Sequence, residues 1–412
     1  MNPTPTRAAG LDRLASFVPN SGRYARLRNF DLGPDDRSNV STLSPYLRTR
    51  LITEEEVALA VLERFAPSTV DKFLQEVAWR TYWKGWLEMR PQVWDAYLDG
   101  LSKCDRNGSY RDAVASRTGI ECFDFWAREL VETGYLHNHA RMWFASIWIF
   151  TLRLPWQLGA DFFLRHLLDG DPASNTLSWR WVAGLHTTGK HYLARASNIA
   201  KSTGGRFNPV GQLDERAGPL PPDADFERRA LAFPDPPPTG RLGQLLIPDD
   251  LTPLDAEATA GWFPENAEVL GAPSEMTIRF QRGALHDVLD RTGGERLHGD
   301  LSEAARAWAE RERLDGILLT RPTVGPWRDV FKDFDPGIPV HHHIGDWDRQ
   351  LWPHATAGFF KLKKRLPKFF ANLGGGAPPL RDLFGEPVWA GSSLLGNRCR
   401  RSWDEGVPPP SL

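Results

Sequence analysis

The chain has 412 residues, of which 41% are hydrophobic and 25% are charged, and its formal net charge is −2. This composition is typical of a soluble globular protein, and the length is sufficient for two domains with sizeable cores. No apolar run approaches the roughly 20 residues that a membrane-spanning helix needs, and residues 1–10 lack the apolar centre of a secretory signal. The sequence therefore predicts a cytoplasmic protein that does not span a membrane.

Cysteine and tryptophan usage narrows the choice further. The three cysteines, Cys104, Cys122 and Cys399, form no CxxC pair and cannot supply the four thiolates of an iron–sulfur cluster. Of the 17 tryptophans, ten lie in residues 1–210, where 26 Lys and Arg residues stand against 22 Asp and Glu residues, a net charge of +4. A mildly basic, tryptophan-rich half is compatible with nucleic acid as a partner.

The first half of the chain has a helical pattern. Residues 1–40 are polar and are expected to lead into a helical domain over residues 41–210. Thr53 can cap a helix with Glu56 at its third position. Apolar periodicity predicts further helices over residues 69–89, 123–131, 138–152 and 162–168. The alternating pattern of strands is almost absent there, so an all-α domain is expected.

The second half has a different pattern. Residues 211–241 are rich in proline, glycine and charge, which predicts a linker or wrapping loop. In residues 242–370, apolar runs at 244–247, 267–270, 316–320 and 338–341 predict buried strands, and residues 278–289 and 301–312 predict helices between them. The alternation favours a small, doubly wound, Rossmann-like α/β domain. Residues 371–412 are expected to form an irregular tail.

Two local patterns in this half have alternative interpretations. Residues 341–343 are three consecutive histidines, which cannot easily face one ion, so no metal site is expected there. Residues 361–368, KLKKRLPK, form a basic cluster that is either a solvated helix end or a contact for phosphate. No GxGxxG fingerprint for a dinucleotide follows a predicted strand in this half.

The helical half contains four motifs that can carry chemistry. The first, STLSPYL at residues 41–47, offers hydroxyls and backbone N–H groups for phosphate just before a helix, although Ser and Thr often only cap such helices. The second places Glu76, Trp79, Arg80 and Trp83 on one helix face. Such a face could line a pocket for a flat heterocycle, or it could be an aromatic core stripe with an arginine that reaches the surface.

The third and fourth motifs are rich in polar groups beside apolar helices. Asn138, Arg141 and Met142 share a helix face. The run from Asp169 to Asn175, DGDPASN, is followed by Trp179 and Trp181. Buried carboxylates need partners, and Arg141 is a candidate partner for one of these aspartates.

The order STLSPYL, ExxWR, TGI…LHNxxRM and DGDxAxN…WxW resembles the FAD-binding domain of DNA photolyases and cryptochromes, over about residues 24–208. The resemblance implies a helical domain that holds FAD in a folded form, while a second, antenna chromophore is left open. It implies FAD contacts at ten positions: Tyr24, Val40, Ser41, Leu43, Ser44, Arg80, Arg141, Asp169, Asp171 and Asn175.

The same resemblance implies roles in DNA binding and electron transfer. It places damaged DNA at Arg28, Glu76, Trp79, Asn138, His139, Met142 and Trp181. Asn175 matches the residue facing the flavin nitrogen that gains a proton, and Trp179 and Trp156 match the inner two members of the tryptophan chain that reduces excited flavin. The usual outer tryptophan has no counterpart, which leaves Tyr110, Trp126 or Trp148 as candidates.

Three departures from the family pattern leave the function open. His139 replaces an arginine, the sequence after Trp181 diverges, and an α/β segment similar to the antenna domain follows the FAD domain instead of preceding it. The resemblance implies a photolyase-like lyase that repairs pyrimidine dimers in DNA by light-driven electron transfer. The alternatives are a cryptochrome-like blue-light sensor without repair activity and a non-photochemical relative that binds FAD.

Overall fold

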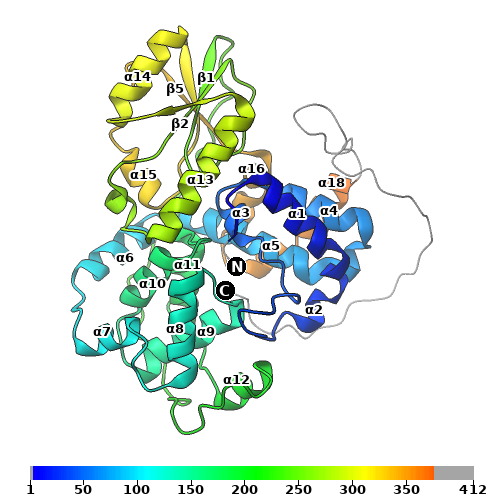
Figure 1. Cartoon of the computed structure of the whole chain (residues 1–412), viewed down its shortest axis with the longest axis vertical. Helices are drawn as coiled ribbons and strands as arrows, with labels where there is room; N and C mark the ends of the chain where they lie inside the picture. The colour runs from blue at the N-terminus through cyan, green and yellow to red at the C-terminus, as the bar shows by residue number, and fades with distance from the viewer. Residues whose placement is uncertain (1–2, 375–412) are drawn as a thin grey trace.

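The computed structural model describes residues 3–374, in which a helical part and a sheet part lie against each other (Figure 1). Up to residue 202 the described regular elements are helical, as expected for residues 41–210, and residues 1–40, expected only to lead into that domain, also form helices. The α-helices there are α1 (Arg7–Phe17), α2 (Tyr24–Leu27), α3 (Ser44–Arg48), α4 (Glu54–Arg64), α5 (Pro67–Glu88), α6 (Gln92–Ser102), α7 (Gly108–Val114), α8 (Glu121–Thr133), α9 (Asn138–Ser146), α10 (Trp156–His166), α11 (Pro172–Ala183) and α12 (Ala196–Ser202).

Local sequence explains where several of these helices begin. The Thr53 side chain accepts a hydrogen bond from the Glu56 backbone and the Glu56 side chain accepts one from the Thr53 backbone, so the predicted cap of α4 is confirmed. Proline occupies the first turn of α5 and of α11, where its missing N–H is not needed. The helix expected over residues 138–152 is α9 followed by a π-helical turn, Ile147–Thr151.

The second half contains a five-stranded parallel sheet in the order β3-β2-β1-β4-β5, which confirms the expected α/β fold. Its strands are β1 (Leu242–Leu246), β2 (Ala258–Trp262), β3 (Glu295–Leu297), β4 (Gly316–Thr320) and β5 (Val340–His343). The helices between strands are α13 (Glu275–Thr292), α14 (Leu301–Glu312) and α15 (Pro326–Val330).

Helices cover both faces of this sheet. Gly261 of β2 meets Leu285 of α13, and Gly243 of β1 meets Trp308 of α14. Since Gly243 is paired with Ala258, three residues before Gly261, the two glycines face opposite sides of the sheet. The sheet is therefore doubly wound, and all five residues of β1 are buried, as expected for a central parallel strand.

One predicted strand is wrong and two strands were not predicted. The run at residues 267–270, predicted as a strand, is a 3₁₀ helix that Asn266 caps and that ends at Gly271 with φ 87°. A four-residue apolar run does not distinguish the two structures. Strands β2 and β3 were not predicted, because the ATAGW sequence of β2 has few large apolar residues and β3 has only three residues.

After β5 the chain returns to the helical part. The helices α16 (Asp346–Leu351), α17 (Phe359–Lys363) and α18 (Leu366–Gly374) contact α4 or α5. Trp347 of α16 donates a hydrogen bond from its indole to the Thr81 hydroxyl of α5, at 2.8 Å. The irregular tail expected over residues 371–412 falls mainly outside the described residues. Within residues 3–374, none of the helices combines the length and the apolar character needed to cross a bilayer.

A buried cluster of ion pairs joins the two parts. Arg50, just after α3, pairs with Asp250 after β1 at 2.7 Å and also with Asp348 of α16. Nearby, Arg48 of α3 pairs with Asp249 at 3.1 Å. All of these side chains are buried. The wrapping segment adds contacts around the outside, such as the hydrogen bond from the Arg229 backbone to Met89.

Replacement of Arg50 tests whether this cluster stabilises the protein. Arg50→Ala leaves Asp250 and Asp348 buried without their cation, so the free energy of unfolding should fall by about 3–5 kcal/mol. Lys103→Ala is the control, because the Lys103 pair with Asp99 is solvent-exposed and should contribute less than about 1 kcal/mol. Thermal and urea unfolding measure both variants, and equal losses would contradict the assigned role of Arg50.

Candidate functional site

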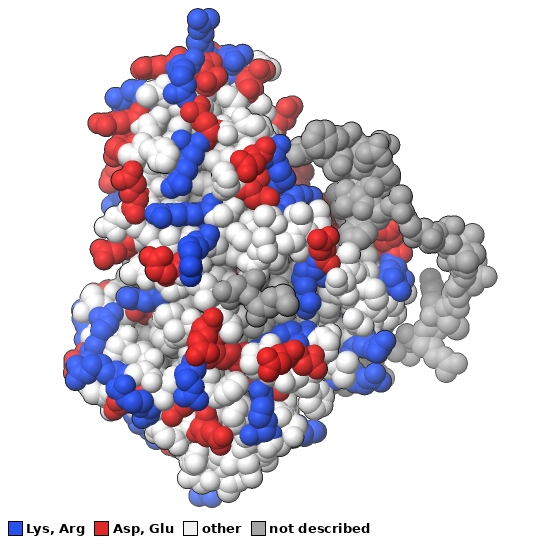
Figure 2. All heavy atoms as spheres, viewed as in Figure 1, with Lys and Arg blue, Asp and Glu red and all other residues white. Residues whose placement is uncertain are grey.

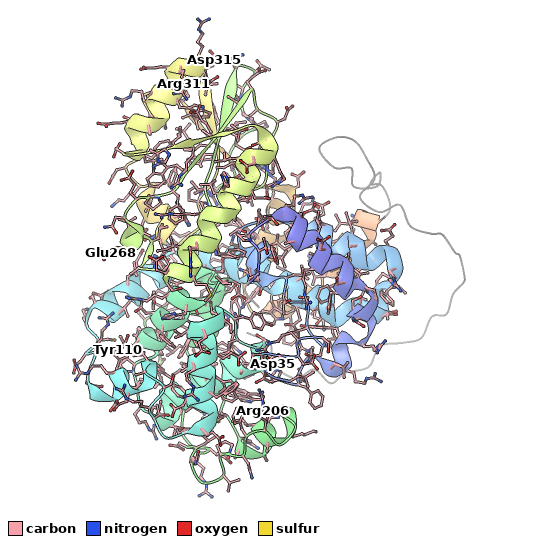
Figure 3. The ribbon with its side chains drawn as sticks, in the orientation of Figure 1. Asp35, Tyr110, Arg206, Glu268, Arg311 and Asp315 are labelled. Carbon is pink, nitrogen blue, oxygen red and sulfur yellow. The ribbon has the colours of Figure 1, made fainter. Side chains whose placement is uncertain are left out.

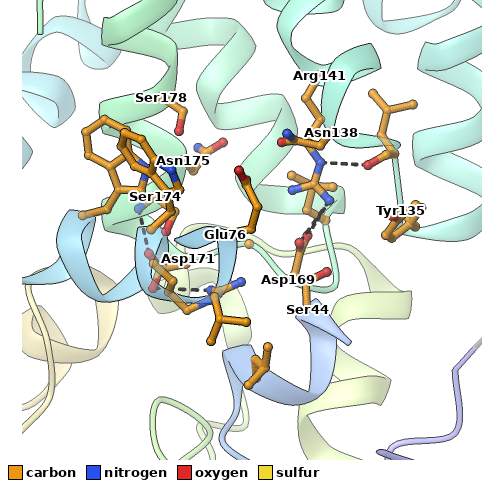
Figure 4. A pocket seen from close by; sticks show the side chains of 18 of the residues that line it. Ser44, Glu76, Tyr135, Asn138, Arg141, Asp169, Asp171, Ser174, Asn175 and Ser178 are labelled. Atoms are coloured by element: carbon orange, nitrogen blue, oxygen red, sulfur yellow. Dashed lines mark hydrogen bonds and ion pairs between the residues drawn. The ribbon is translucent and has the colours of Figure 1, made fainter. Parts of the chain in front are cut away.

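A cavity lies in the helical part between α2, α3, α5, α9 and α11, with about 1160 Å³ of space free of protein atoms. Figure 4 shows polar side chains from these elements converging on it, among them Glu76, Asn138, Arg141, Asp169 and Asp171. All four sequence motifs contribute to its lining, although they are far apart in the sequence.

The residues expected to bind a cofactor are mostly brought together here. Eight of the ten line the cavity: Tyr24, Ser41, Ser44, Arg80, Arg141, Asp169, Asp171 and Asn175. The other two, Val40 and Leu43, have buried side chains in the described structure that do not line it. They belong to the turn before α3, so their part in the site is to position that turn.

The turn before α3 forms one end of the cavity. Arg13 of α1 donates hydrogen bonds to the backbone carbonyls of Ser41, at 2.7 Å, and Val40, at 3.1 Å, and these hold the turn in place. Ser44 is the first residue of α3, and the described structure shows no side-chain cap on this helix. Hydroxyls and backbone N–H groups at such a helix start suit an anionic group such as a phosphate.

The predicted pairing of Arg141 with Asp169 is present. Nη2 of Arg141 donates to both carboxylate oxygens of Asp169 at 3.0 Å, and its Nε donates to the Leu136 carbonyl at 2.9 Å. Burial alone raises the pKa of Asp169, but Arg141, Arg80 and a hydrogen bond from Ser44 lower it more, so the net pKa lies below the ordinary value of 3.8. Asp169 is therefore an anion at neutral pH.

Asp171 is more deeply buried than Asp169 and contacts different residues. Oδ1 of Asp171 accepts a hydrogen bond from the Ser174 backbone N–H at 2.7 Å and so caps the start of α11. Oδ2 lies 3.9 Å from Nη1 of Arg80 and 4.0 Å from Nζ of Lys84. Burial raises its pKa, but Lys84, Arg80 and Arg48 together lower it below 3.8. Asp171 Oδ2 and Arg80 Nη1 are both buried and have no hydrogen-bond partner among the described residues. Such groups fit a polar ligand placed between them.

Comparison with known proteins identifies this arrangement. Residues 73–216 match the family model described as the FAD binding domain of DNA photolyase. This part of the chain is similar to the FAD-binding domain of photolyases and cryptochromes. FAD, the cofactor expected from the sequence, is the cofactor of this photolyase-type domain.

Individual relatives of the photolyase/cryptochrome family match the same part of the chain. The chain is 31% identical over 234 residues to a deoxyribodipyrimidine photo-lyase of Agrobacterium fabrum, covering 55% of this chain and 45% of that protein. It is 30% identical over 241 residues to a deoxyribodipyrimidine photo-lyase of Streptomyces griseus, covering 57% of this chain and 51% of that protein. A crystal structure of a bacterial class III photolyase from Agrobacterium tumefaciens is 27% identical, with a TM-score of 0.42, and covers 48% of this chain and 43% of that chain. The chain spans about half the length of the relatives it matches.

The positions expected from the sequence to contact DNA are only partly assembled at the cavity. Glu76, Trp79 and Asn138 line it, and Glu76 pairs with Arg28 beside it. The remaining three predicted positions are absent from the described lining: His139, Met142 and Trp181. Met142 is buried, and Trp181 is stacked on Tyr192 with ring centroids 5.9 Å apart.

His139 stands at a position where the family resemblance implies an arginine, and it differs from arginine in charge. Burial, followed by the nearby charge of Arg28, lowers the pKa of His139 to about 4. The ring is therefore neutral at neutral pH, and its Nδ1 is buried without a hydrogen-bond partner in the described structure. His139 therefore contributes no positive charge at neutral pH at this expected DNA contact.

The aromatic residues near the cavity form a path to the surface. Trp179 lines the cavity and contacts Trp148, with ring centroids 6.2 Å apart, and Trp148 contacts Tyr110 at 6.1 Å. Tyr110 lies on α7 at the outer edge of the helical part (Figure 3). Trp156 instead contacts Tyr97 at 5.6 Å, and Trp126 contacts Trp143. Among the described residues, no ring contact joins Trp156 to Trp179.

Two residues that contact the lining of the cavity, Lys84 and Phe359, are not indicated by the sequence motifs. Lys84 follows Arg80 by one helical turn on α5, so helical spacing could have indicated it. Phe359 stacks on Trp79 with ring centroids 3.7 Å apart and planes at 15°. No local signal could have found that contact, because the two residues are far apart in the sequence.

The lowered pKa of Asp169 leads to a test by pH. A carboxyl whose folded pKa is lowered contributes stability above its unfolded pKa, and that contribution is lost as the pH falls below 3.8. Asp169→Asn should lower the free energy of unfolding by about 2 kcal/mol at neutral pH, and its stability should then fall less steeply in acid. Urea unfolding at neutral pH and at a pH of about 3.5 measures this.

The control for that experiment is Asp112→Asn, since Asp112 pairs with Arg117 in solvent. This variant should keep the wild-type acid profile. An acid profile of Asp169→Asn that is as steep as that of the wild type would contradict the assigned ion pair.

Proposed function

We propose that this chain is a photolyase-like enzyme that binds FAD in the cavity and repairs pyrimidine dimers in DNA by light-driven electron transfer. The observation that supports this most strongly is the cavity itself, in which Asp171 and Arg80 have unpartnered buried atoms beside the Arg141–Asp169 pair. The relatives named deoxyribodipyrimidine photo-lyase support the same activity. We also propose that the protein acts in the cytoplasm.

The residues in the cavity divide the work of holding FAD. Ser41, Ser44 and the start of α3 would bind the diphosphate, and Arg80 would add positive charge. Asn175 donates from its side-chain amide to the Ala160 carbonyl at 2.8 Å, which orients the amide in the cavity wall. An amide can donate or accept, so it can hydrogen-bond a flavin nitrogen in either protonation state. Bound FAD would supply the electron transfer, while these residues supply position and charge.

A DNA lesion must leave the base stack to reach this cavity. Glu76, which pairs with Arg28, would meet such a base together with Trp79 and Asn138, since all three line the cavity. On the face shown in Figure 2, positive and negative side chains are interspersed over both parts of the molecule. Charge on that face does not mark a DNA-binding surface, so the proposed contact with DNA rests on the cavity.

The direct test is repair of a defined substrate. Reduced protein with bound FAD should, under blue light, restore thymines in an oligonucleotide that contains a cyclobutane dimer, and it should restore none in the dark. Chromatography of the digested oligonucleotide measures the restored thymine. Absence of repair above the dark level, in protein that contains FAD, would exclude this activity.

The aromatic path gives a second test, based on flavin reduction. With a thiol as the external reductant, Trp179→Phe should abolish light-driven reduction of bound FAD, because Trp179 is the member of the path that lines the cavity. Trp148→Phe should slow the reduction more than Trp156→Phe, because only Trp148 is in ring contact with Trp179. Flavin absorbance during illumination measures the rate. A larger effect of Trp156→Phe would assign the second step to Trp156.

A blue-light sensor without repair activity is the second candidate. Two observations favour it: His139 supplies no cation at the expected DNA contact, and Phe359 covers part of Trp79. A sensor would reduce its flavin in light and leave dimers intact. The repair assay and the absorbance assay, run on the same preparation, separate the two functions.

A further inference from the structure

Trp79 is covered on one face by a ring from the far end of the described chain. The Phe359 ring lies 3.7 Å from the Trp79 ring, centroid to centroid, with planes at 15°, and Phe359 is only 4% exposed. This is the geometry in which a nucleobase stacks on a tryptophan. Because Trp79 also lines the cavity, Phe359 occupies a stacking position at the proposed site of DNA entry.

The segment that carries Phe359 packs on α5 through the buried side chains of Phe359 and Leu362, and two hydrogen bonds join its backbone to that end of the helix. The Tyr82 hydroxyl donates to the Ala357 carbonyl at 2.8 Å, and Arg90 donates to the Thr356 carbonyl at 3.0 Å. Residues 355–358, Ala-Thr-Ala-Gly, are all small, and the last two are exposed. These four residues can change their backbone conformation with no large side chain of their own, so the main cost of displacing α17 is the exposure of Phe359 and Leu362.

The same segment carries the charge that suits a phosphate backbone. Residues 359–368, FFKLKKRLPK, contain five Lys and Arg residues and no carboxylate. Burial, followed by the nearby charge of Lys363, lowers the pKa of Lys72 on α5, and Arg28 acts in the same direction. Lys72 of α5, Lys363 of α17 and Arg28 just after α2 therefore lie near one another, together with the carboxylates of Asp71 and Glu76. A nucleic acid strand that approaches here meets positive charge from the helix that must move.

We propose, on the basis of the proposed function, that Phe359 is an internal substitute for a nucleobase. It keeps Trp79 covered in the free protein, and an extruded base of DNA displaces it and stacks in its place. Residues 355–363 then leave the cavity side of α5, while their lysines can follow the phosphates. Affinity for DNA is thus the difference between two stacking interactions on one tryptophan.

Removal of the competing ring should tighten DNA binding. Phe359→Ala in the full chain with bound FAD should bind a dimer-containing oligothymidylate about tenfold more tightly than the wild type does. Phe359→Leu, which keeps more of the packing but cannot stack, should shift affinity in the same direction. Phe360→Ala is the matched control, because Phe360 is the next residue and is 54% exposed; it should bind like the wild type. Fluorescence anisotropy of a labelled oligonucleotide measures all four proteins.

A second measurement follows the segment directly. Backbone amides in residues 359–363 should exchange with solvent faster when the oligonucleotide is bound to the wild type, because α17 has left its position. Unchanged or weaker affinity in both Phe359 variants, or slower exchange in this segment on binding, would overturn the proposal.

The outcomes distinguish this proposal from the proposed function. Wild-type protein that repairs dimers, together with Phe359 variants that bind no more tightly, would refute the displacement and leave the repair activity standing. Binding by Phe359→Ala but not by the wild type would support the displacement, whether or not repair occurs. If neither protein binds the oligonucleotide, the displacement and the DNA-repair function both fail, while FAD binding is tested separately by the flavin content of the protein.

Discussion

The cavity depends on two aspartates that cannot be buried without cations. Asp169 and Asp171 flank one glycine in the loop before α11, and each faces a different helix: Asp169 meets Arg141 of α9, and Asp171 meets Arg80 and Lys84 of α5. Burial penalises both charges, and these cations offset most of that cost, with help from the Ser44 side chain at Asp169 and from Arg48 and the Ser174 backbone at Asp171. The three ion pairs therefore hold α5, α9 and the start of α11 around one space.

The connection between the two parts of the molecule follows the same rule. Open parallel sheets often bind ligands at the carboxyl ends of their strands. Here the residues after the carboxyl end of β1 instead form ion pairs with Arg48, the last residue of α3, and with Arg50 just after it. These arginines satisfy Asp249 and Asp250 and bring the sheet against the turn that carries Ser41 and Ser44. The α/β part thereby supports one wall of the cofactor cavity.

Local patterns were sufficient to predict much of this arrangement from the sequence. The helix-face spacing from Glu76 to Trp83 and the DGD motif identify which side chains project together, because those relations are fixed within a turn or two of chain. The doubly wound sheet followed from alternating apolar runs, although residues 267–270 were assigned to the wrong element and β2 was missed. Small residues in β2 gave no apolar signal.

Contacts between distant segments could not be predicted in this way. The stacking of Phe359 on Trp79, and the contact of Trp148 rather than Trp156 with Trp179, depend on how whole helices pack. Both change the functional interpretation, since one covers a proposed base-binding surface and the other redirects the aromatic path. A family resemblance assigns a role to a residue from its position in the sequence. Whether the residue has the neighbours that this role needs depends on how the helices pack.

The central claim is that Arg141, Asp169, Asp171 and Arg80 form a binding site for FAD. The absorption spectrum of the purified protein tests it most directly. We expect a flavin spectrum whose intensity corresponds to about one FAD per chain, and we expect this spectrum to be lost when Arg80 is replaced by Met. A colourless protein that takes up no FAD on reconstitution would contradict the account.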